Sequence, residues 1–122
     1  MPIDHLDHVQ LALPPGREAD AVAFYQDLLG IPQVPKPAHL AGRGGCWFEA
    51  GALRVHLGVD SEFHPARRAH PAFVVTDLVE FVDHLAAAGV VARWDEPFEG
   101  TISAYVDDPF GNRIELLEHL PG

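Results

Sequence analysis

The sequence predicts an α+β fold made of two βαβββ modules, and three observations support this prediction. Two segments have the apolar periodicity of amphipathic helices. Short strand-like runs bounded by turn residues make up most of the remaining chain. The order strand, helix, strands occurs twice, which indicates an internal repeat.

Each of the two predicted helices has one apolar face and is followed by a glycine. The first helix runs from about Arg17 to Leu29, with Gly30 directly after it. The second helix is expected to be capped by Asp77 or Thr76 and to end before Gly89. Apolar residues recur at i, i+3 or i+4, and i+7 in both segments, which is the spacing of a helix that packs on a sheet.

The predicted strands are short and lie before and after each predicted helix in the sequence. Gly51 is expected to form the tight turn of a hairpin between the second and third strands. The stretch Pro32–Gly45, rich in Pro and Gly, is expected to be a loop with one poorly marked edge strand. The predicted strands are Leu6–Leu13, Cys46–Ala50, Leu53–Val59, His70–Val75, Val90–Trp94, Ile102–Val106 and Arg113–Leu117.

The two halves of the chain align with each other. Asp7–Leu13 matches Ala69–Val75 near the start of the halves, and Arg54–Leu57 matches Arg113–Leu116 near their ends. A repeat of this length cannot bury its sheet by itself. We therefore expect the two repeats to share a core or to pair with another chain.

The length and composition predict a single domain over residues 1–122, with repeats at about 3–59 and about 69–118. The net charge of −10 argues against nucleic acid as a partner, because neutralising phosphates needs a basic surface. Cys46 is the only cysteine, which excludes an intrachain disulfide and a cysteine-rich metal site. The sequence has no signal-peptide pattern and no apolar run of about 18 residues, so we expect a cytoplasmic protein without a membrane partner.

Four residues with metal-binding side chains occupy equivalent positions in the two repeats. His8 is equivalent to His70, and His56 is equivalent to Glu115. Side chains alternate between the faces of a strand, so all four point away from the apolar face of their strands. On a concave sheet, these imidazoles and the carboxylate would suit a divalent ion such as Zn, Fe, Mn, Ni or Co. Alternatively, they are four exposed residues on solvated strand faces.

Four motifs along the chain match those of one known superfamily. The motifs are Asp7-His8-Val9, Phe24-Tyr25-x-x-Leu28-Leu29-Gly30, Ala69-His70-x-Ala72-Phe73 and Asp108-Pro109-x-Gly111-Asn112-x-Ile114-Glu115-Leu116. On these motifs the chain resembles the vicinal-oxygen-chelate superfamily, from about Ile3 to Leu117. The superfamily includes glyoxalase I, extradiol dioxygenases, methylmalonyl-CoA epimerase, and fosfomycin- and bleomycin-resistance proteins. The resemblance implies an open barrel-like cup with the helices outside, and a homodimer.

The resemblance also implies roles for individual residues. It implies that His8, His70 and Glu115 are metal ligands. His56 falls on the fourth ligand of glyoxalase-type members, which have a glutamate or glutamine there. Tyr105 matches a substrate-contacting position of the fosfomycin-resistance thiol transferases, but a phosphonate substrate is disfavoured by the negative net charge.

These observations lead us to expect a metal-dependent enzyme that acts on a small oxygen-rich substrate chelated to a divalent ion. The reaction would be that of a lyase, an isomerase, a thiol transferase or a dioxygenase, with Glu115, His56 and Tyr105 as the catalytic candidates. The alternative is a non-enzymatic, drug-sequestering protein of the bleomycin-resistance type. Sequestering members generally lack the ligand set that this chain keeps, which favours the enzyme.

Four further residues have side chains that could act at the site. Cys46 is expected to be a small buried hydrophobe rather than a nucleophile. Glu49 is either a candidate base or, as we prefer, an exposed hairpin carboxylate. Arg54 and Arg113 share the ligand face, where they would bind an acidic substrate group or lie exposed at strand ends.

Overall fold

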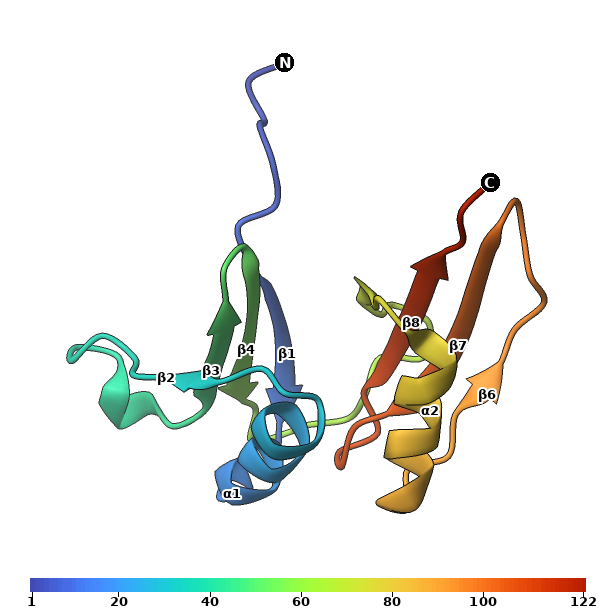
Figure 1. Cartoon of the computed structure of the whole chain (residues 1–122). Coiled ribbons are helices and arrows are strands. Elements are labelled where there is room, and N and C mark those ends of the chain that lie inside the picture. The colour runs from blue at the N-terminus through green and yellow to red at the C-terminus, as the bar shows by residue number, and fades with distance from the viewer. The chain divides into compact units, whose positions relative to one another are not determined.

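The computed structural model describes residues 1–122, which divide into two compact units, Met1–His64 and Pro65–Gly122. Each unit contains one four-stranded sheet and one main helical region, and the first unit also has a short 3-10 helix, η2 (Ala41–Arg43) (Figure 1). The element order is βαβββ in both units, which confirms the predicted α+β class. No strand pairing joins the two sheets into a closed barrel.

The first unit begins with β1 (Val9–Leu13), which is an edge strand of its sheet. The sheet order is β1-β4-β3-β2, with β1 parallel to β4 and the other neighbours antiparallel. Both strands of the central hairpin have the predicted bounds. The remaining elements are α1 (Glu18–Ala21), η1 (Val22–Leu28), β2 (Gln33–Val34), η2 (Ala41–Arg43), β3 (Cys46–Ala50) and β4 (Leu53–Val59).

The helical region of the first unit differs from the regular amphipathic α-helix that the sequence predicts. Only α1 is α-helical, and η1 has the wider turn of a π-helix. The backbone N–H of Leu29 donates to the carbonyl of Phe24, five residues earlier, at 2.9 Å. Apolar spacing does not distinguish the two helix types over so few turns. No helix of the chain combines the length and apolar character needed to span a membrane.

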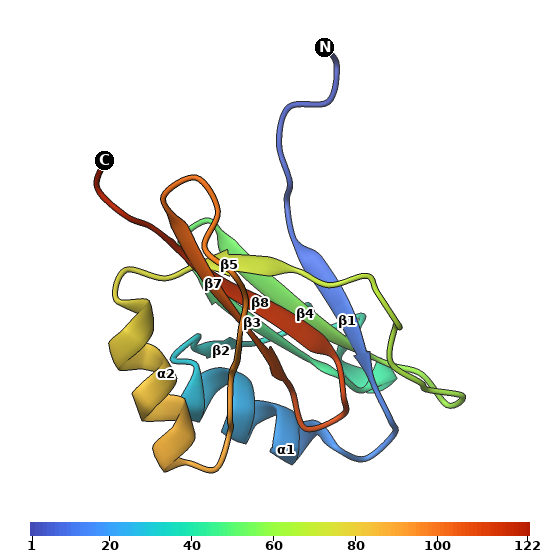
Figure 2. The same ribbon diagram turned by 90° about the vertical axis from the view of Figure 1, so that its right-hand side faces the viewer.

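The second unit repeats the topology of the first. Its sheet order is β5-β8-β7-β6, with β5 parallel to β8 and the other neighbours antiparallel. Helix α2 lies beside this sheet and contacts β8 (Figure 2). The elements are β5 (Ala72–Val74), α2 (Leu78–Ala87), β6 (Arg93–Trp94), β7 (Thr101–Asp107) and β8 (Arg113–His119).

Alternation along β4 and β8 separates core residues from candidate site residues. Val55 and Leu57 of β4 are buried, and so are Ile114 and Leu116 of β8. Burying each of these side chains contributes about 1.5–3 kcal/mol. The residues between them, at positions 56 and 115, point to the opposite face of their strands. The core therefore fixes the direction of both candidate side chains.

The first strand of each unit is shorter than predicted. β1 begins at Val9 rather than Leu6, and β5 begins at Ala72 rather than His70. Pro71 has no N–H to donate, although its carbonyl still accepts from the N–H of Glu115 at 3.0 Å. His8 and His70 consequently lie in the segments just before the strands, one and two residues ahead of the regular pairing.

A tight turn, Asp108–Asn112, connects β7 to β8 and sets the position of Glu115. The buried carboxylate of Asp108 accepts hydrogen bonds from the backbone N–H groups of Phe110 and Asn112, at 2.9 and 2.8 Å. It also accepts from the Asn112 side-chain amide at 2.8 Å. Gly111 has a φ of 91°, a left-handed conformation that favours glycine.

Candidate functional site

The first unit brings two of the predicted ligands together. The rings of His8 and His56 are stacked, with centroids 4.4 Å apart and an interplanar angle of 22°. β1 and β4 are parallel, with Val9 opposite Val55, so the residue before β1 lies beside β4. The pairing of β1 with β4 thus explains how His8, which lies just before β1, contacts the His56 ring on β4.

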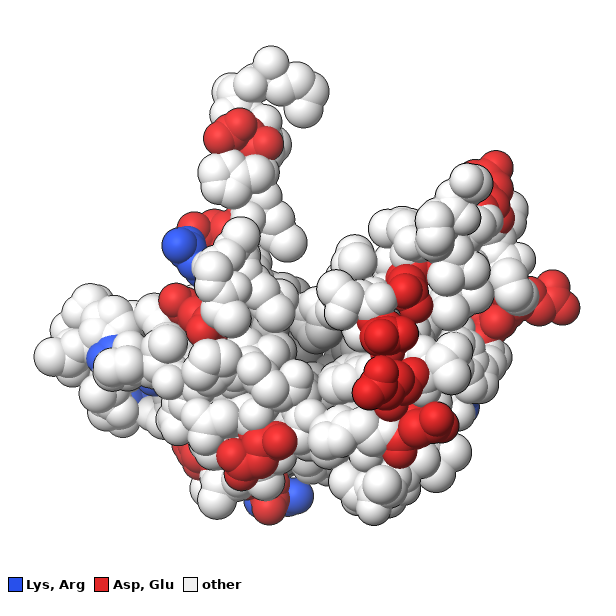
Figure 3. Space-filling view, viewed as in Figure 1, with Lys and Arg blue, Asp and Glu red and all other residues white.

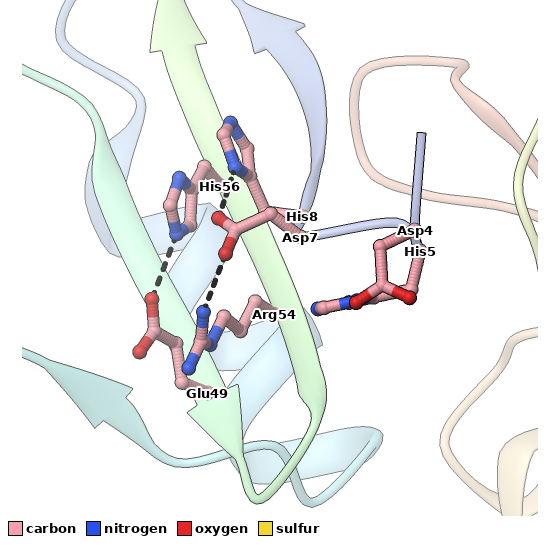
Figure 4. A network of polar contacts seen from close by, with 7 residues as sticks. All are labelled: Asp4, His5, Asp7, His8, Glu49, Arg54 and His56. Atoms are coloured by element: carbon pink, nitrogen blue, oxygen red, sulfur yellow. Dashed lines mark hydrogen bonds and ion pairs between the residues drawn. The ribbon is translucent and has the colours of Figure 1, made fainter. Parts of the chain in front are cut away.

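The His56 ring is buried and held on a second side by Trp47. The two rings are 3.9 Å apart and almost parallel, at 3°, because these residues are direct partners across β3 and β4. His56 Nε2 lies 2.8 Å from a carboxylate oxygen of Glu49, whose side chain is 27% exposed (Figure 4). Glu49 is therefore a half-buried hydrogen-bond partner of a candidate site residue, and not the exposed hairpin carboxylate that we preferred.

The His8 ring is held through its other nitrogen. His8 Nδ1 donates to Asp7 Oδ2 at 2.9 Å, and Arg54 Nη1 donates to Asp7 Oδ1 at 2.7 Å (Figure 4). The hydrogen bond from His8, together with the positive charge of Arg54, lowers the pKa of Asp7 below its ordinary value. Arg54 is thus bound to a carboxylate of its own unit.

The second unit brings the other two predicted ligands together. His70 Nε2 lies 3.1 Å from Glu115 Oε1, and each side chain is about one-quarter exposed or less. His70 Nδ1 lies 2.8 Å from the backbone carbonyl oxygen of Arg68. A carbonyl oxygen can only accept a hydrogen bond, so Nδ1 carries the proton. In the neutral ring, Nε2 then faces Glu115 with its lone pair.

This arrangement of donors suits a divalent cation. Two lone pairs that face each other at 3.1 Å repel unless a proton or a cation lies between them. Two donors on one ion, with bonds of about 2.1 Å, are about 3.0 Å apart at a right angle and about 3.4 Å apart at the tetrahedral angle. The spacing and the chemistry of the His70–Glu115 pair therefore fit a nitrogen and an oxygen ligand of the same metal.

Tyr105 lies next to this pair, directly opposite Glu115 in the β7–β8 register. Its ring meets the His70 ring edge-on, with centroids 5.5 Å apart. Desolvation, followed by the negative charge of Glu115, raises the pKa of Tyr105, so the phenol keeps its proton at neutral pH. Arg113 lies over the Tyr105 ring at 5.8 Å from its centroid.

The structure thus arranges the four predicted ligands as two pairs, one in each unit. Neither unit contains a group of three or more His, Cys, Asp or Glu side chains arranged to hold a metal ion. Sequence reasoning missed Asp7 and undervalued Glu49. Two signals in the sequence pointed to them. Asp7 stands directly before His8, whereas the second repeat has Ala69 at the equivalent position, and Glu49 is two residues after Trp47, so both side chains lie on the same face of their strand.

Cys46 takes no part in this chemistry. Its side chain is buried, as expected from the sequence. Burial raises the pKa of the Cys46 thiol to about 11, and the charge of Glu18 adds to the effect. Very little thiolate exists at neutral pH, so the thiol is a poor nucleophile there.

Acidic side chains gather over the second unit on the face shown in Figure 3. The acidic residues Asp77, Glu80 and Asp83 of this unit are exposed along α2 or directly before it. Such a surface repels polyanions such as nucleic acids.

Three known proteins show what this chain is similar to. A lactoylglutathione lyase from Haemophilus influenzae is 30% identical over 111 residues, covering 81% of this chain and 82% of the relative. The solved structure of a glyoxalase family protein from Bacillus anthracis is 47% identical, covers 96% of both chains and has a TM-score of 0.92. A fosfomycin resistance protein from Listeria monocytogenes shares the fold at 18% identity, with a TM-score of 0.75 over 95% of this chain and 93% of that one.

A family model matches almost the whole chain. It is the model described as Glyoxalase/Bleomycin resistance protein/Dioxygenase superfamily, and it covers residues 5–116. The matched range includes His8, His70 and Glu115, together with the turn before β8. The chain therefore belongs to the glyoxalase/bleomycin resistance protein/dioxygenase superfamily.

Proposed function

We propose that this protein is a metal-dependent enzyme of the glyoxalase type that acts on a small oxygen-rich substrate. The observation that carries the proposal is the His70–Glu115 pair, in which a nitrogen and an oxygen face each other at the spacing of two ligands on one ion. Among lyase, isomerase, thiol transferase and dioxygenase reactions, the similarity to a lactoylglutathione lyase favours a lyase.

The proposed ligands are His8, His70 and Glu115, which supply two imidazoles and one carboxylate. This donor set suits a divalent ion such as Zn, Ni, Fe, Mn or Co. Once bound, the ion would act as a Lewis acid on the substrate oxygens. His56 remains a predicted fourth donor, through Nδ1, because its Nε2 is hydrogen-bonded to Glu49.

The remaining candidates act through hydrogen bonds and proton transfer. In a site of three ligands, in which His56 does not bind the ion, its Nε2–H is donated to Glu49 and its Nδ1 lone pair can accept a proton from a substrate. The protonated phenol of Tyr105 can donate a hydrogen bond to a developing oxyanion or to Glu115. Together with Glu115, which would hold the ion, His56 and Tyr105 are the proposed catalytic residues.

Metal analysis of the purified protein tests the proposal. We expect about one divalent ion per chain, and a lower melting temperature after chelation, because an ion that binds only the folded state stabilises it. His8→Ala and His70→Ala should each lower the metal content. His64→Ala is the matched control, because this exposed histidine is hydrogen-bonded only to the backbone carbonyl of Glu62.

The metal site would be contradicted if the protein bound no Zn, Ni, Mn or Co and if none of these ions changed its melting temperature. In that outcome, the drug-sequestering function of the bleomycin-resistance type becomes the better hypothesis. Tight binding of an aromatic drug to the metal-free protein would support it.

A further inference from the structure

We propose that Asp7 is a positioning residue for the metal site, which holds His8 so that Nε2 is the nitrogen available to the ion. This inference rests on the proposed function, because it takes His8 to be a ligand. The Asp7 carboxylate accepts a hydrogen bond from His8 Nδ1 at 2.9 Å. A carboxylate that binds one ring nitrogen fixes the tautomer and the orientation of the ring, and increases the basicity of the other nitrogen.

Arg54 prevents the Asp7 side chain from rotating freely. Asp7 is 66% exposed, so its hydrogen bond to His8 alone would compete with water. The guanidinium of Arg54 binds the second carboxylate oxygen at 2.7 Å, and this residue is anchored on β4. The stack of the His8 ring on His56, also from β4, restrains the imidazole from the same strand. Two contacts from one strand therefore hold the Asp7–His8 pair.

Comparison of the repeats shows what the carboxylate adds. Ala69 stands where the first repeat has Asp7, and the backbone carbonyl of Arg68 accepts the hydrogen bond from His70 Nδ1. Arg113, the equivalent of Arg54, lies over the Tyr105 ring instead. The same nitrogen is held in both histidines, but only in His8 by a full negative charge. We therefore expect the charge of Asp7 to strengthen His8 as a donor.

The chain contains a matched control for this carboxylate. Asp4 Oδ2 lies 2.8 Å from Nδ1 of His5, so the adjacent Asp–His contact occurs twice within five residues. Both residues of this second pair are highly exposed, and neither belongs to the proposed site. Asp4→Asn removes the same charge from the same kind of pair a few residues away.

The first experiment measures the affinity of the full chain for Co²⁺ by competition with a chromogenic chelator. Asp7→Asn and Asp7→Ala are expected to weaken binding by about 10- to 100-fold, the usual effect of removing such a partner. Arg54→Gln should have a smaller effect in the same direction, and Asp4→Asn should have none. If both Asp7 variants bind Co²⁺ as wild type does, while His8→Ala loses it, the inference is wrong and the proposed function stands.

The second experiment needs no metal. Nitrogen-15 NMR of the His8 ring in the metal-free protein reports which nitrogen carries the proton. We expect the Nδ1–H tautomer in wild type and in Asp4→Asn, and a shift toward the Nε2–H tautomer in Asp7→Ala. An unchanged tautomer in Asp7→Ala would overturn the inference. If wild type binds no metal, the proposed function fails, and the tautomer still decides whether Asp7 orients His8.

Discussion

Each histidine of the candidate site has one ring nitrogen engaged, which determines the nitrogen left for a metal ion or a proton. His8 and His70 are held through Nδ1, by a carboxylate and by a carbonyl. His56 is held through Nε2 by Glu49. The three rings therefore differ in chemistry, although all are histidines on the non-core side of their chain segments.

The place of His56 as a fourth donor leads to a prediction about metal affinity. We expect His56→Ala to weaken metal binding less than His8→Ala does, because a site with three protein ligands is already chemically complete without His56. Catalytic turnover should fall in both variants. Dissociation constants for Co²⁺ measured on the two variants, beside His119→Ala as a surface control, check this order. Equal losses of affinity would instead establish His56 as a full ligand.

Glu115→Gln tests the anionic ligand of the second unit. The amide keeps the length of the side chain but lacks the charge that would partly neutralise the ion. We expect metal affinity to fall about 10-fold or more, with a change of about 1 kcal/mol or less in the unfolding free energy of the metal-free protein. Glu115 lies on the face opposite to Ile114 and Leu116, so the core is not disturbed. Unchanged metal content would remove Glu115 from the ligand set.

At the scale of elements, the turn between β7 and β8 stabilises the strand that carries Glu115. One buried carboxylate, that of Asp108, accepts two backbone N–H groups and one side-chain amide. Hydrogen bonds to a charged group contribute more than neutral ones, and buried donors without an acceptor are costly. The presence of Asp108 in the turn Asp108–Asn112 is therefore explained by local structure and needs no catalytic role.

Asp108→Ala is expected to lower the free energy of unfolding by about 3 kcal/mol, because it leaves the buried donors without their acceptor. Asp60→Ala is the matched control, since the exposed Asp60 carboxylate accepts only from the N–H of Glu62. Its cost should stay below about 1 kcal/mol. Urea denaturation of both variants measures the difference, and similar midpoints would contradict the structural role of Asp108.

At the scale of the whole molecule, the two units share one topology and each has two edge strands. The edge strands are β1 and β2 in the first sheet and β5 and β6 in the second. Edge strands leave backbone hydrogen-bonding groups without strand partners, and units of this size are marginally stable alone. These features support the predicted homodimer, which remains a proposal.

We expect sedimentation to give about twice the chain mass of 13.3 kDa. Mixing two inactive variants then tests how the ligands are distributed. His8→Ala lies in the first unit and Glu115→Ala in the second. If two chains supply each site, mixed dimers contain one site with both native residues and regain metal, whereas sites within single chains regain none. A monomeric protein would contradict the proposed dimer.

The sequence by itself determined the fold class, the repeat and the face on which each candidate residue lies. Alternation along a strand is a local property of the backbone, so the apolar residues around His56 and Glu115 predict the direction of these two side chains. The hairpin bounds followed for the same reason, because Gly51 marks its turn. The ends of β1 and β5 depend on pairing with distant strands, and there the sequence prediction was too long.

Only the tertiary structure decided which partner each side chain takes. Arg54 and Asp7 are 47 residues apart in the chain, and His70 and Glu115 are 45 apart. Such contacts depend on strand register and on side-chain rotamers, and the local periodicity of the sequence predicts neither. The sequence therefore identified the donors, whereas the structure determined which nitrogen of each histidine is available, because that depends on a hydrogen bond made across the fold.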